Sequence, residues 1–175
     1  MLMNKLNLKN VVAITICLVV ATIMFAQEIK AVNNSVKWST HNMDSEDCSD
    51  NPIYKKMIAL KEQYPEGMKW TNDDHYKWKG GIYSGGSGCS GFAFILSDAA
   101  FGKRPARKHY NFDSLRIGDI FRINNDTHSV VIICVNSTTV TLAEGNFNSS
   151  ICWGRTFSIE DFKSKVDYII TRYPE

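Results

Sequence analysis

The sequence predicts an α+β domain in which helical segments come first and a run of antiparallel strands follows. Residues 52–61 carry apolar side chains at helical spacing, and Pro52 suits the first position of a helix. Residues 92–99 repeat that spacing, and Gly102 follows at the point where a glycine commonly ends a helix. Beyond Gly102 the chain changes to short apolar segments separated by polar turns. Helices followed by such strands are typical of the α+β class.

The expected strands are short and are separated by turn residues. A turn at 124–126 is rich in Asn and Asp, and a second turn is expected at 136–137. One further strand should follow residues 151–153 and end near Phe157. The other four strands are expected at residues 118–123, 128–135, 138–143 and 168–173. Together they should form one small antiparallel sheet against which the helices pack.

The N-terminal segment has the layout of an export signal. Lys5 and Lys9 precede an uncharged run at 11–26, which is shorter than the ~20 residues that span a bilayer. We therefore expect a signal peptide at 1–31, cleaved after Ala31 or alternatively after Ala26, a flexible arm at 32–50 and one domain at 51–175. The mature protein should then be secreted, with membrane contact only through the signal segment before cleavage.

Composition restricts the classes of partner. The chain has 175 residues, of which 44% are hydrophobic and 22% charged, so it is long enough for one ordinary domain. Without residues 1–31 the basic and acidic residues balance, and no basic stripe remains that would favour nucleic acid. The acidic residues at 44–50 lack the rhythm of a calcium loop, and the cysteine spacing does not fit a zinc site. We expect no metal, no cofactor and a monomer.

A glycine-rich stretch at 85–91 delivers one cysteine, Cys89, to the start of the second predicted helix. Glycines allow tight turns and leave space over the sulfur. Unpaired N–H groups and the helix dipole at a helix start favour the thiolate, so they lower the pKa of a thiol. This position predicts a nucleophile. The alternative is that Cys89 is a small buried apolar residue.

The other cysteines of the mature chain have no such context. Cys134 lies within an apolar strand and is interpreted as a core residue. Cys48 and Cys152 could pair, although nothing in the local sequence requires it. The spacing does not resemble a disulfide framework.

His128 is the predicted partner of the thiol, because it stands between a polar turn and a buried strand. A neutral imidazole can take the thiol proton and later return it to a leaving amine. The next strand ends with Glu144 and Asn146, and antiparallel pairing would bring this end level with His128. Residues separated by one position share a face of a strand, so both could point at the cleft. We expect Glu144 to orient His128, with Asn146 as a helper, and the reverse assignment stays open.

Aromatic residues precede the glycine-rich stretch. Tyr76, Trp78 and Tyr83 lie among polar residues next to the predicted nucleophile. Such aromatics line substrate grooves, or they cover the core. We expect them to contribute to a substrate or oxyanion site.

These motifs resemble those of the papain-like superfamily of cysteine peptidases and amidases. The Cys-Ser-Gly-Phe sequence at 89–92 is similar to the start of the catalytic helix in NlpC-like cell-wall peptidases, and Gly118-Asp119 followed by His128 is similar to their next strands. The Glu-Gly-Asn sequence at 144–146 is closer to the CHAP amidases. The resemblance covers residues 76–173. It implies a papain-like domain, association with the cell wall and hydrolysis of an amide bond in peptidoglycan, with Tyr76 or Tyr83 near the oxyanion site.

Two other functions remain open from the sequence. A transglutaminase-like acyl transferase also uses a cysteine, a histidine and an acidic residue in this order. A catalytically inactive cell-wall binding module could also keep this fold. The self or foreign origin of the wall and the bond that is cut are not encoded in any motif that we identify.

Overall fold

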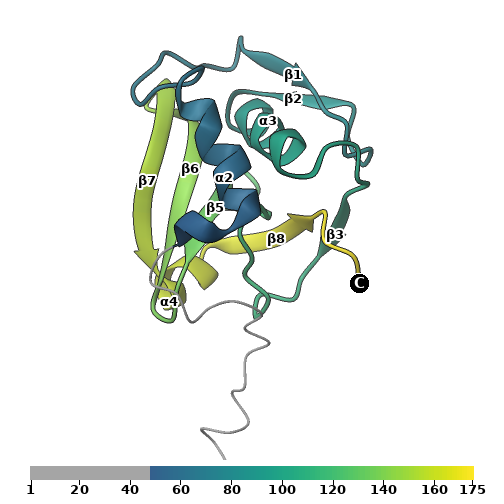
Figure 1. Ribbon diagram of the computed structural model, residues 1–175, viewed down its shortest axis with the longest axis vertical. Coiled ribbons are helices and arrows are strands. Elements are labelled where there is room, and N and C mark those ends of the chain that lie inside the picture. The colour runs from purple at the N-terminus through teal and green to yellow at the C-terminus, as the bar shows by residue number, and fades with distance from the viewer. Residues whose placement is uncertain (1–47) are drawn as a thin grey trace, which may run out of the picture. The chain divides into compact units, whose positions relative to one another are not determined.

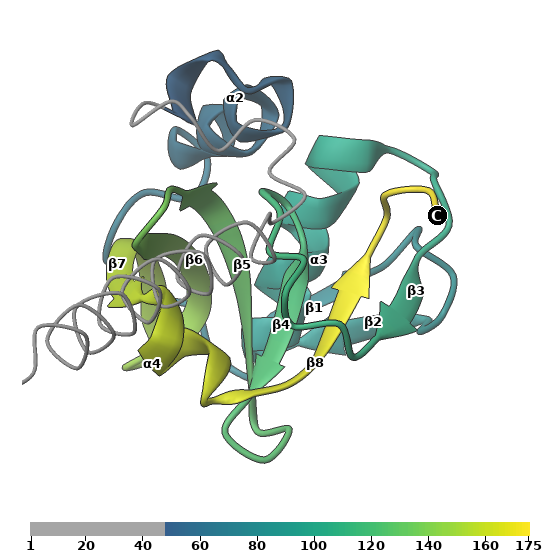
Figure 2. The same ribbon diagram turned by 90° about the horizontal axis from the view of Figure 1, so that it is seen from below.

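A computed structural model describes residues 48–175, which form an α+β domain (Figure 1). The main sheet has six strands in the spatial order β3-β8-β4-β5-β6-β7, and every pair of neighbours is antiparallel. Helices α2 and α3 contact one another and cover the β5 and β6 region of this sheet (Figures 1 and 2). The predicted fold class and the packing of N-terminal helices on an antiparallel sheet are confirmed.

The strands of the main sheet agree closely with the apolar segments of the sequence. The fifth strand occupies the predicted residues, and the turn before it has positive φ angles at all three predicted positions, 124–126. Asparagine and aspartate tolerate this backbone conformation better than most residues. The strands are β3 (Arg107–His109), β4 (Ile120–Ile123), β5 (His128–Val135), β6 (Thr139–Phe147), β7 (Ser150–Ser158) and β8 (Val166–Thr171). Strand β3 was not predicted, because its Arg-Lys-His sequence lacks an apolar alternation.

The N-terminal helix follows from its capping residues. Helix α2 (Pro52–Ile58) has the proline in its first turn, and the Asn51 side chain accepts hydrogen bonds from two backbone N–H groups. A 3-10 turn, η2 (Ala59–Lys61), continues it to the predicted end. Helix α4 (Ile159–Lys163) is a short element after β7, capped by Ser158, that the sequence did not predict.

Helix α3 (Gly88–Phe101) is the central element of the domain and ends at Gly102, as predicted. A two-stranded sheet of β1 (His75–Lys77) and β2 (Gly85–Ser87) packs against it (Figure 1). A side chain at Gly86 would come within 2.7 Å of Ser90 Cβ, so glycine permits this close approach. Most of α3 is buried, which explains why its apolar residues are not confined to one stripe.

A disulfide corrects two expectations about the cysteines. Cys48 is bonded to Cys134, with their Cα atoms 5.6 Å apart, while Cys89 and Cys152 are free. Cys134 is therefore a cross-linked residue rather than a simple core thiol, and the alternative Cys48–Cys152 pair is absent. The disulfide joins the 3-10 turn η1 (Cys48–Asp50) to strand β5. Two residues separated by 86 positions meet only in the folded sheet, so local spacing could not reveal the pair.

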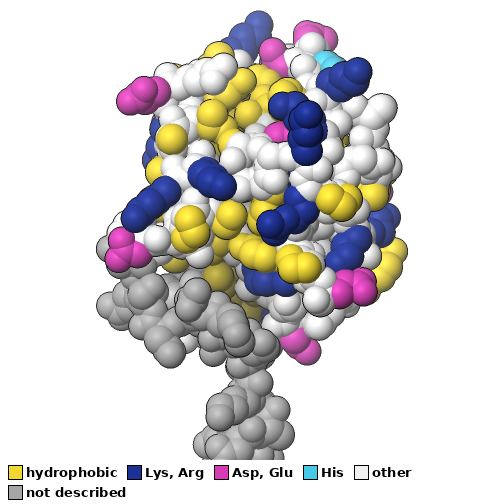
Figure 3. Space-filling view, turned by 45° about the vertical axis from the view of Figure 1, so that its right-hand side comes forward, with side chains coloured by type: hydrophobic (Ala, Val, Ile, Leu, Met, Phe, Trp, Pro, Cys, Tyr) yellow, Lys and Arg dark blue, Asp and Glu magenta, His cyan; other side chains and the backbone are white. Residues whose placement is uncertain are grey.

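The predicted signal peptide and residues 32–47 of the predicted arm lie outside the described residues. Within residues 48–175, no helix is both long enough and apolar enough to cross a membrane. On the face drawn in Figure 3, the Lys and Arg side chains are interspersed with hydrophobic and uncharged polar ones.

Candidate active site

The start of helix α3 is fixed so that it presents Cys89. Trp70 Nε1 donates a hydrogen bond to the Gly88 carbonyl at 2.8 Å, and Gly88 N–H donates to the Asp74 carbonyl at 3.0 Å. Gly88 has φ +56°, and a Cβ there would lie 2.3 Å from Asn72 Oδ1. Both features require glycine. Cys89 consequently lies in the first helical turn, where backbone N–H groups have no partner within the helix.

His128 and Glu144 are brought together by the pairing of β5 and β6. Val131 pairs with Ala143, so His128 and Glu144 project from the same face of the sheet. His128 Nε2 lies 2.8 Å from Glu144 Oε2, and the Glu144 side chain is fully buried. Because Nε2 is held by the carboxylate, Nδ1 is the imidazole nitrogen left for Cys89.

The thiol and the imidazole lie close enough that each changes the pKa of the other. Burial raises the pKa of Cys89, but hydrogen bonds with the His128 ring and the Ser129 backbone N–H outweigh it, so the pKa falls to about 7. Burial lowers the pKa of His128, whereas hydrogen bonds with Cys89 and Glu144 raise it to about 9. Between these two values the thiolate–imidazolium form is favoured. A thiolate at neutral pH is the form of cysteine that attacks carbonyl carbon.

Arg155 completes the set of charged groups around the imidazole. From β7 it donates to both oxygens of Glu144, with Nε to Oε1 and Nη2 to Oε2 each at 2.5 Å. Its guanidinium also lies 4.5 Å from the Phe147 ring centroid and 4.7 Å from that of Phe157. Burial raises the pKa of Glu144, but the hydrogen bonds with His128 and Arg155 lower it overall. The carboxylate therefore stays ionised beside the imidazolium.

The side chain of Asn146 forms its hydrogen bond with a residue other than His128. The Asn146 backbone has φ +56°, and the pairing of β6 with β7 is irregular between Glu144 and Phe147. The Asn146 side chain instead donates to Asn72 Oδ1 at 2.9 Å, beside Gly88. The expectation that Glu144 and Asn146 share a face of the strand assumed regular strand geometry, which does not extend to Asn146.

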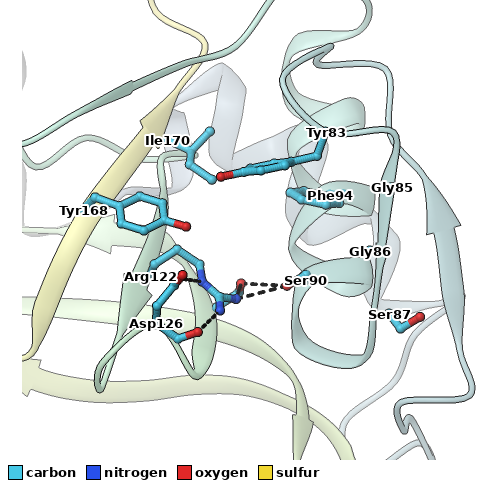
Figure 4. A pocket seen from close by; sticks show the side chains of 11 residues that line it. Tyr83, Gly85, Gly86, Ser87, Ser90, Phe94, Arg122, Asp126, Tyr168 and Ile170 are labelled. Carbon is cyan, nitrogen blue, oxygen red and sulfur yellow. Dashed lines mark hydrogen bonds and ion pairs between the residues drawn. The ribbon is translucent and has the colours of Figure 1, made fainter.

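A cavity of about 270 Å³ lies near the thiol, because Arg122, which lines it, is close enough to Cys89 to lower its pKa. Ser90, which follows Cys89, and Ser129, which follows His128, are both part of its lining. Tyr83, one of the aromatic residues expected near the site, lines this cavity (Figure 4). The remaining lining residues are Gly85, Gly86, Ser87, Phe94, Arg122, Asp126, Tyr168 and Ile170.

Tyr76 and Trp78, the other two aromatic residues expected near the site, do not line this cavity. The Tyr76 hydroxyl donates to Asp98 Oδ2 at 3.0 Å, and burial together with this hydrogen bond raises the pKa of Tyr76 to about 12. Trp78 is buried and stacks on Phe94 with 4.2 Å between ring centroids. Both residues cover the core around α3, which is the other interpretation that the sequence allowed.

Arg122 and Arg155 are the charged residues of this region that sequence reasoning missed. Each lies on a strand whose partner strand carries an acidic or catalytic candidate, but no local motif marks either arginine. Within residues 48–175, no three His, Cys, Asp or Glu side chains gather as a metal site.

No protein-family model and no curated protein sequence matches the chain. A crystal structure of Ly7917 overlaps with 70% of this chain and 61% of that chain, at a TM-score of 0.47 and 13% identity. The crystal structure of Ly7917 with the hydrolyzing product of MDP overlaps with 40% of this chain and 35% of that chain, at a TM-score of 0.33 and 17% identity. The chain thus spans less than two thirds of either matched chain. Likenesses of this extent do not define a family or an activity.

Proposed function

We propose that this protein is a secreted cysteine hydrolase that cleaves amide bonds in peptidoglycan peptides. The observation that carries the proposal is the series Cys89–His128–Glu144, in which His128 is hydrogen bonded to Glu144 and contributes to lowering the pKa of the thiol to about 7. A nucleophile, a base and a group that orients the base are the components of amide hydrolysis through a covalent intermediate. The resemblance of the motifs to NlpC-like and CHAP enzymes supports peptidoglycan as the substrate.

In the first half of the reaction, the Cys89 thiolate attacks the carbonyl carbon of the scissile amide. The negative charge that develops on the carbonyl oxygen can be stabilised by the Cys89 N–H in the first turn of α3. The His128 imidazolium then gives its proton to the amide nitrogen. The C–N bond breaks, the amine leaves and a thioester to Cys89 remains.

In the second half, water replaces the amine. Neutral His128 accepts a proton from the water as its oxygen attacks the thioester carbonyl. The C–S bond breaks, which releases a carboxylic acid and restores the thiolate–imidazolium pair. Glu144, held by Arg155, keeps the imidazole ring oriented and favours its protonated form in both halves.

Secretion is supported by the cysteine chemistry as well as by the layout of residues 1–31. Disulfides persist mainly in oxidising compartments outside the cytosol. The Cys48–Cys134 bond lies inside the domain, with Cys48 mostly buried. This arrangement is typical of a structural disulfide in an exported protein.

The experiment is digestion of purified peptidoglycan with the mature protein, followed by mass analysis of the released fragments. We expect new amine and carboxyl ends with wild type and with Cys152→Ser, which removes the other free thiol, and none with Cys89→Ala. Hydrolysis by a folded Cys89→Ala protein would refute the proposal. Products that carry an added amine instead of water would identify an acyl transferase, and binding without products would identify a binding module.

A further inference from the structure

The cavity near Cys89 is lined by a half-buried cation, Arg122, whose charge is already neutralised. Arg122 on β4 donates from Nε to Asp126 Oδ1 at 2.5 Å and from Nη2 to the Asp126 carbonyl. Its Nη1 donates to Ser129 Oγ at 2.6 Å and to Ser90 Oγ at 3.1 Å. Four of the five N–H groups of a guanidinium are therefore used inside the protein. An anionic ligand would find few donors left on Arg122.

The carboxylate is occupied to a similar degree. Asp126 is bonded to Arg122 and to the Tyr168 hydroxyl, and both interactions lower its pKa although burial opposes them. Burial and the neighbouring Tyr83 and Asp126 raise the pKa of Tyr168, so its hydroxyl stays protonated. Two further residues of opposite charge contact these groups. Lys108 Nζ lies 3.5 Å from the Tyr168 ring centroid, and Asp167 accepts a hydrogen bond from the Asp126 N–H at 2.9 Å. The charges around the cavity thus balance.

The remaining side chains that line the cavity carry hydroxyls or aromatic rings, apart from the aliphatic Ile170. Figure 4 shows Tyr83 and Phe94 on one side and Tyr168 opposite, with Arg122 and Asp126 below them. Ser90 and Ser129 share a hydrogen bond of 3.1 Å, so one of the two hydroxyl hydrogens remains for a ligand. The rings of Tyr83 and Phe94 stack at 6.3 Å and offer an apolar wall.

From this balance we propose that the cavity is a specificity subsite for an uncharged, hydrogen-bonding side chain of the substrate, next to the scissile amide. A carboxamide or hydroxyl can use the serine and tyrosine hydroxyls and the aromatic walls without a new charge being buried. A carboxylate or an ammonium would bring a charge for which the site holds no free counter-ion. The link between this subsite and catalysis rests on the proposed function. The balance of charges in the cavity does not depend on it.

Specificity for neutral side chains is tested with three versions of a peptide that the wild type cleaves. They differ only in the residue beside the cleaved amide, which carries a carboxamide, a carboxylate or a primary amine. We expect kcat/KM to be about tenfold higher for the carboxamide than for either charged peptide, the effect of roughly one hydrogen bond or ion pair. Equal rates, or a preference for either charged peptide, would overturn the subsite.

Two substitutions change the charge balance in opposite directions. Asp126→Asn should shift the preference toward the carboxylate peptide by about tenfold, and Arg122→Gln should shift it toward the amine peptide. Each result is a ratio of kcat/KM values between two substrates. Any effect of Arg122 on the reactivity of the thiol changes both values equally and cancels from the ratio. Asp126 is more than half exposed, so its variant carries the test if Arg122→Gln does not fold. Asp113→Asn, which removes an exposed carboxylate outside the cavity, should leave the ratios unchanged. An unchanged ratio in folded Asp126→Asn would overturn the proposal.

A binding measurement separates the subsite from catalysis. In the Cys152→Ser background, capped glutamine (N-acetylglutamine amide) should protect Cys89 from iodoacetamide at about tenfold lower concentration than capped glutamate or capped lysine. Protection in this order without hydrolysis of peptidoglycan would refute the proposed function and leave the subsite. Hydrolysis together with equal protection by all three probes would refute the subsite and leave the function.

Discussion

Arg155 is predicted to control the protonation of His128 through Glu144. Arg155→Met keeps most of the side-chain length and apolar contacts but removes two charge-assisted hydrogen bonds to a fully buried carboxylate. Each such bond contributes about 1.5–3 kcal/mol. Because the Arg155 side chain is 30% exposed, water can replace part of these hydrogen bonds in the variant. We therefore expect the transition state to lose stabilisation equal to about one of the two bonds. A loss of about 1.5–3 kcal/mol corresponds to a tenfold to hundredfold fall in kcat/KM.

The pH dependence distinguishes this role from a structural one. In wild type, activity should rise as Cys89 ionises around pH 7 and fall as His128 loses its proton around pH 9. Arg155→Met removes a group that lowers the pKa of Glu144. Glu144 stays ionised in this pH range, and without Arg155 its charge acts on the imidazolium alone while a nearby positive charge is lost, so the pKa of His128 rises and the alkaline limb moves to higher pH.

The assay is a profile of kcat/KM between pH 5 and about 10.5 on a released peptidoglycan peptide, with circular dichroism as the folding control. Arg155→Lys, which keeps the charge but not the bidentate geometry, should recover part of the rate. Arg107→Gln is the matched control, because that arginine is similarly exposed and pairs with Glu175. A folded Arg155→Met protein with the wild-type rate and alkaline limb would refute this role.

Three further predictions follow from the same contacts. Cys134→Val should keep turnover but lose about 4–5 kcal/mol of stability, measured by denaturant unfolding, because its disulfide closes a long loop; a dead but folded variant would implicate the wrong thiol. Glu144→Gln should reduce kcat/KM far more than Asn146→Ala and alone move the alkaline limb to lower pH, and the opposite ranking would assign the orienting role to Asn146. Gly88→Ala should lower both stability and Cys89 reactivity, because its Cβ would meet Asn72, whereas Gly81→Ala, where nothing lies within 4 Å, should lower stability only; equal reactivity in both variants would contradict this.

The parts of the fold that the sequence predicted are those in which local signals agree with tertiary packing. Strand β5 and the start of α2 carry both an apolar pattern and a clear turn or cap, and both were located closely. Strand β1 was missed because it is short and polar, and β2 because glycines indicate a loop. The pairing of β1 with β2 depends on α3 beneath them, which no local pattern describes.

The residues of the candidate site likewise fall into those that local sequence signals predicted and those that they did not. Cys89, His128 and Glu144 were predicted because a helix start and an antiparallel hairpin determine where their side chains lie. Arg155 pairs with Leu142 across the β6 and β7 hairpin, so the register of that hairpin would have indicated its approach to Glu144. The aromatic residues were harder to assign. Trp78 is buried and Tyr83 is exposed, although both lie in similar polar sequence surroundings that do not indicate burial.

The most direct test of the activated thiol is the pH dependence of Cys89 alkylation by iodoacetamide in a Cys152→Ser protein. A midpoint near pH 7 is expected, because His128 and the Ser129 N–H stabilise the thiolate against the effect of burial. His128→Ala should move that midpoint upward, to or above the ordinary thiol value of about 8.5. A wild-type midpoint at about 8.5 that His128→Ala does not change would contradict the central claim.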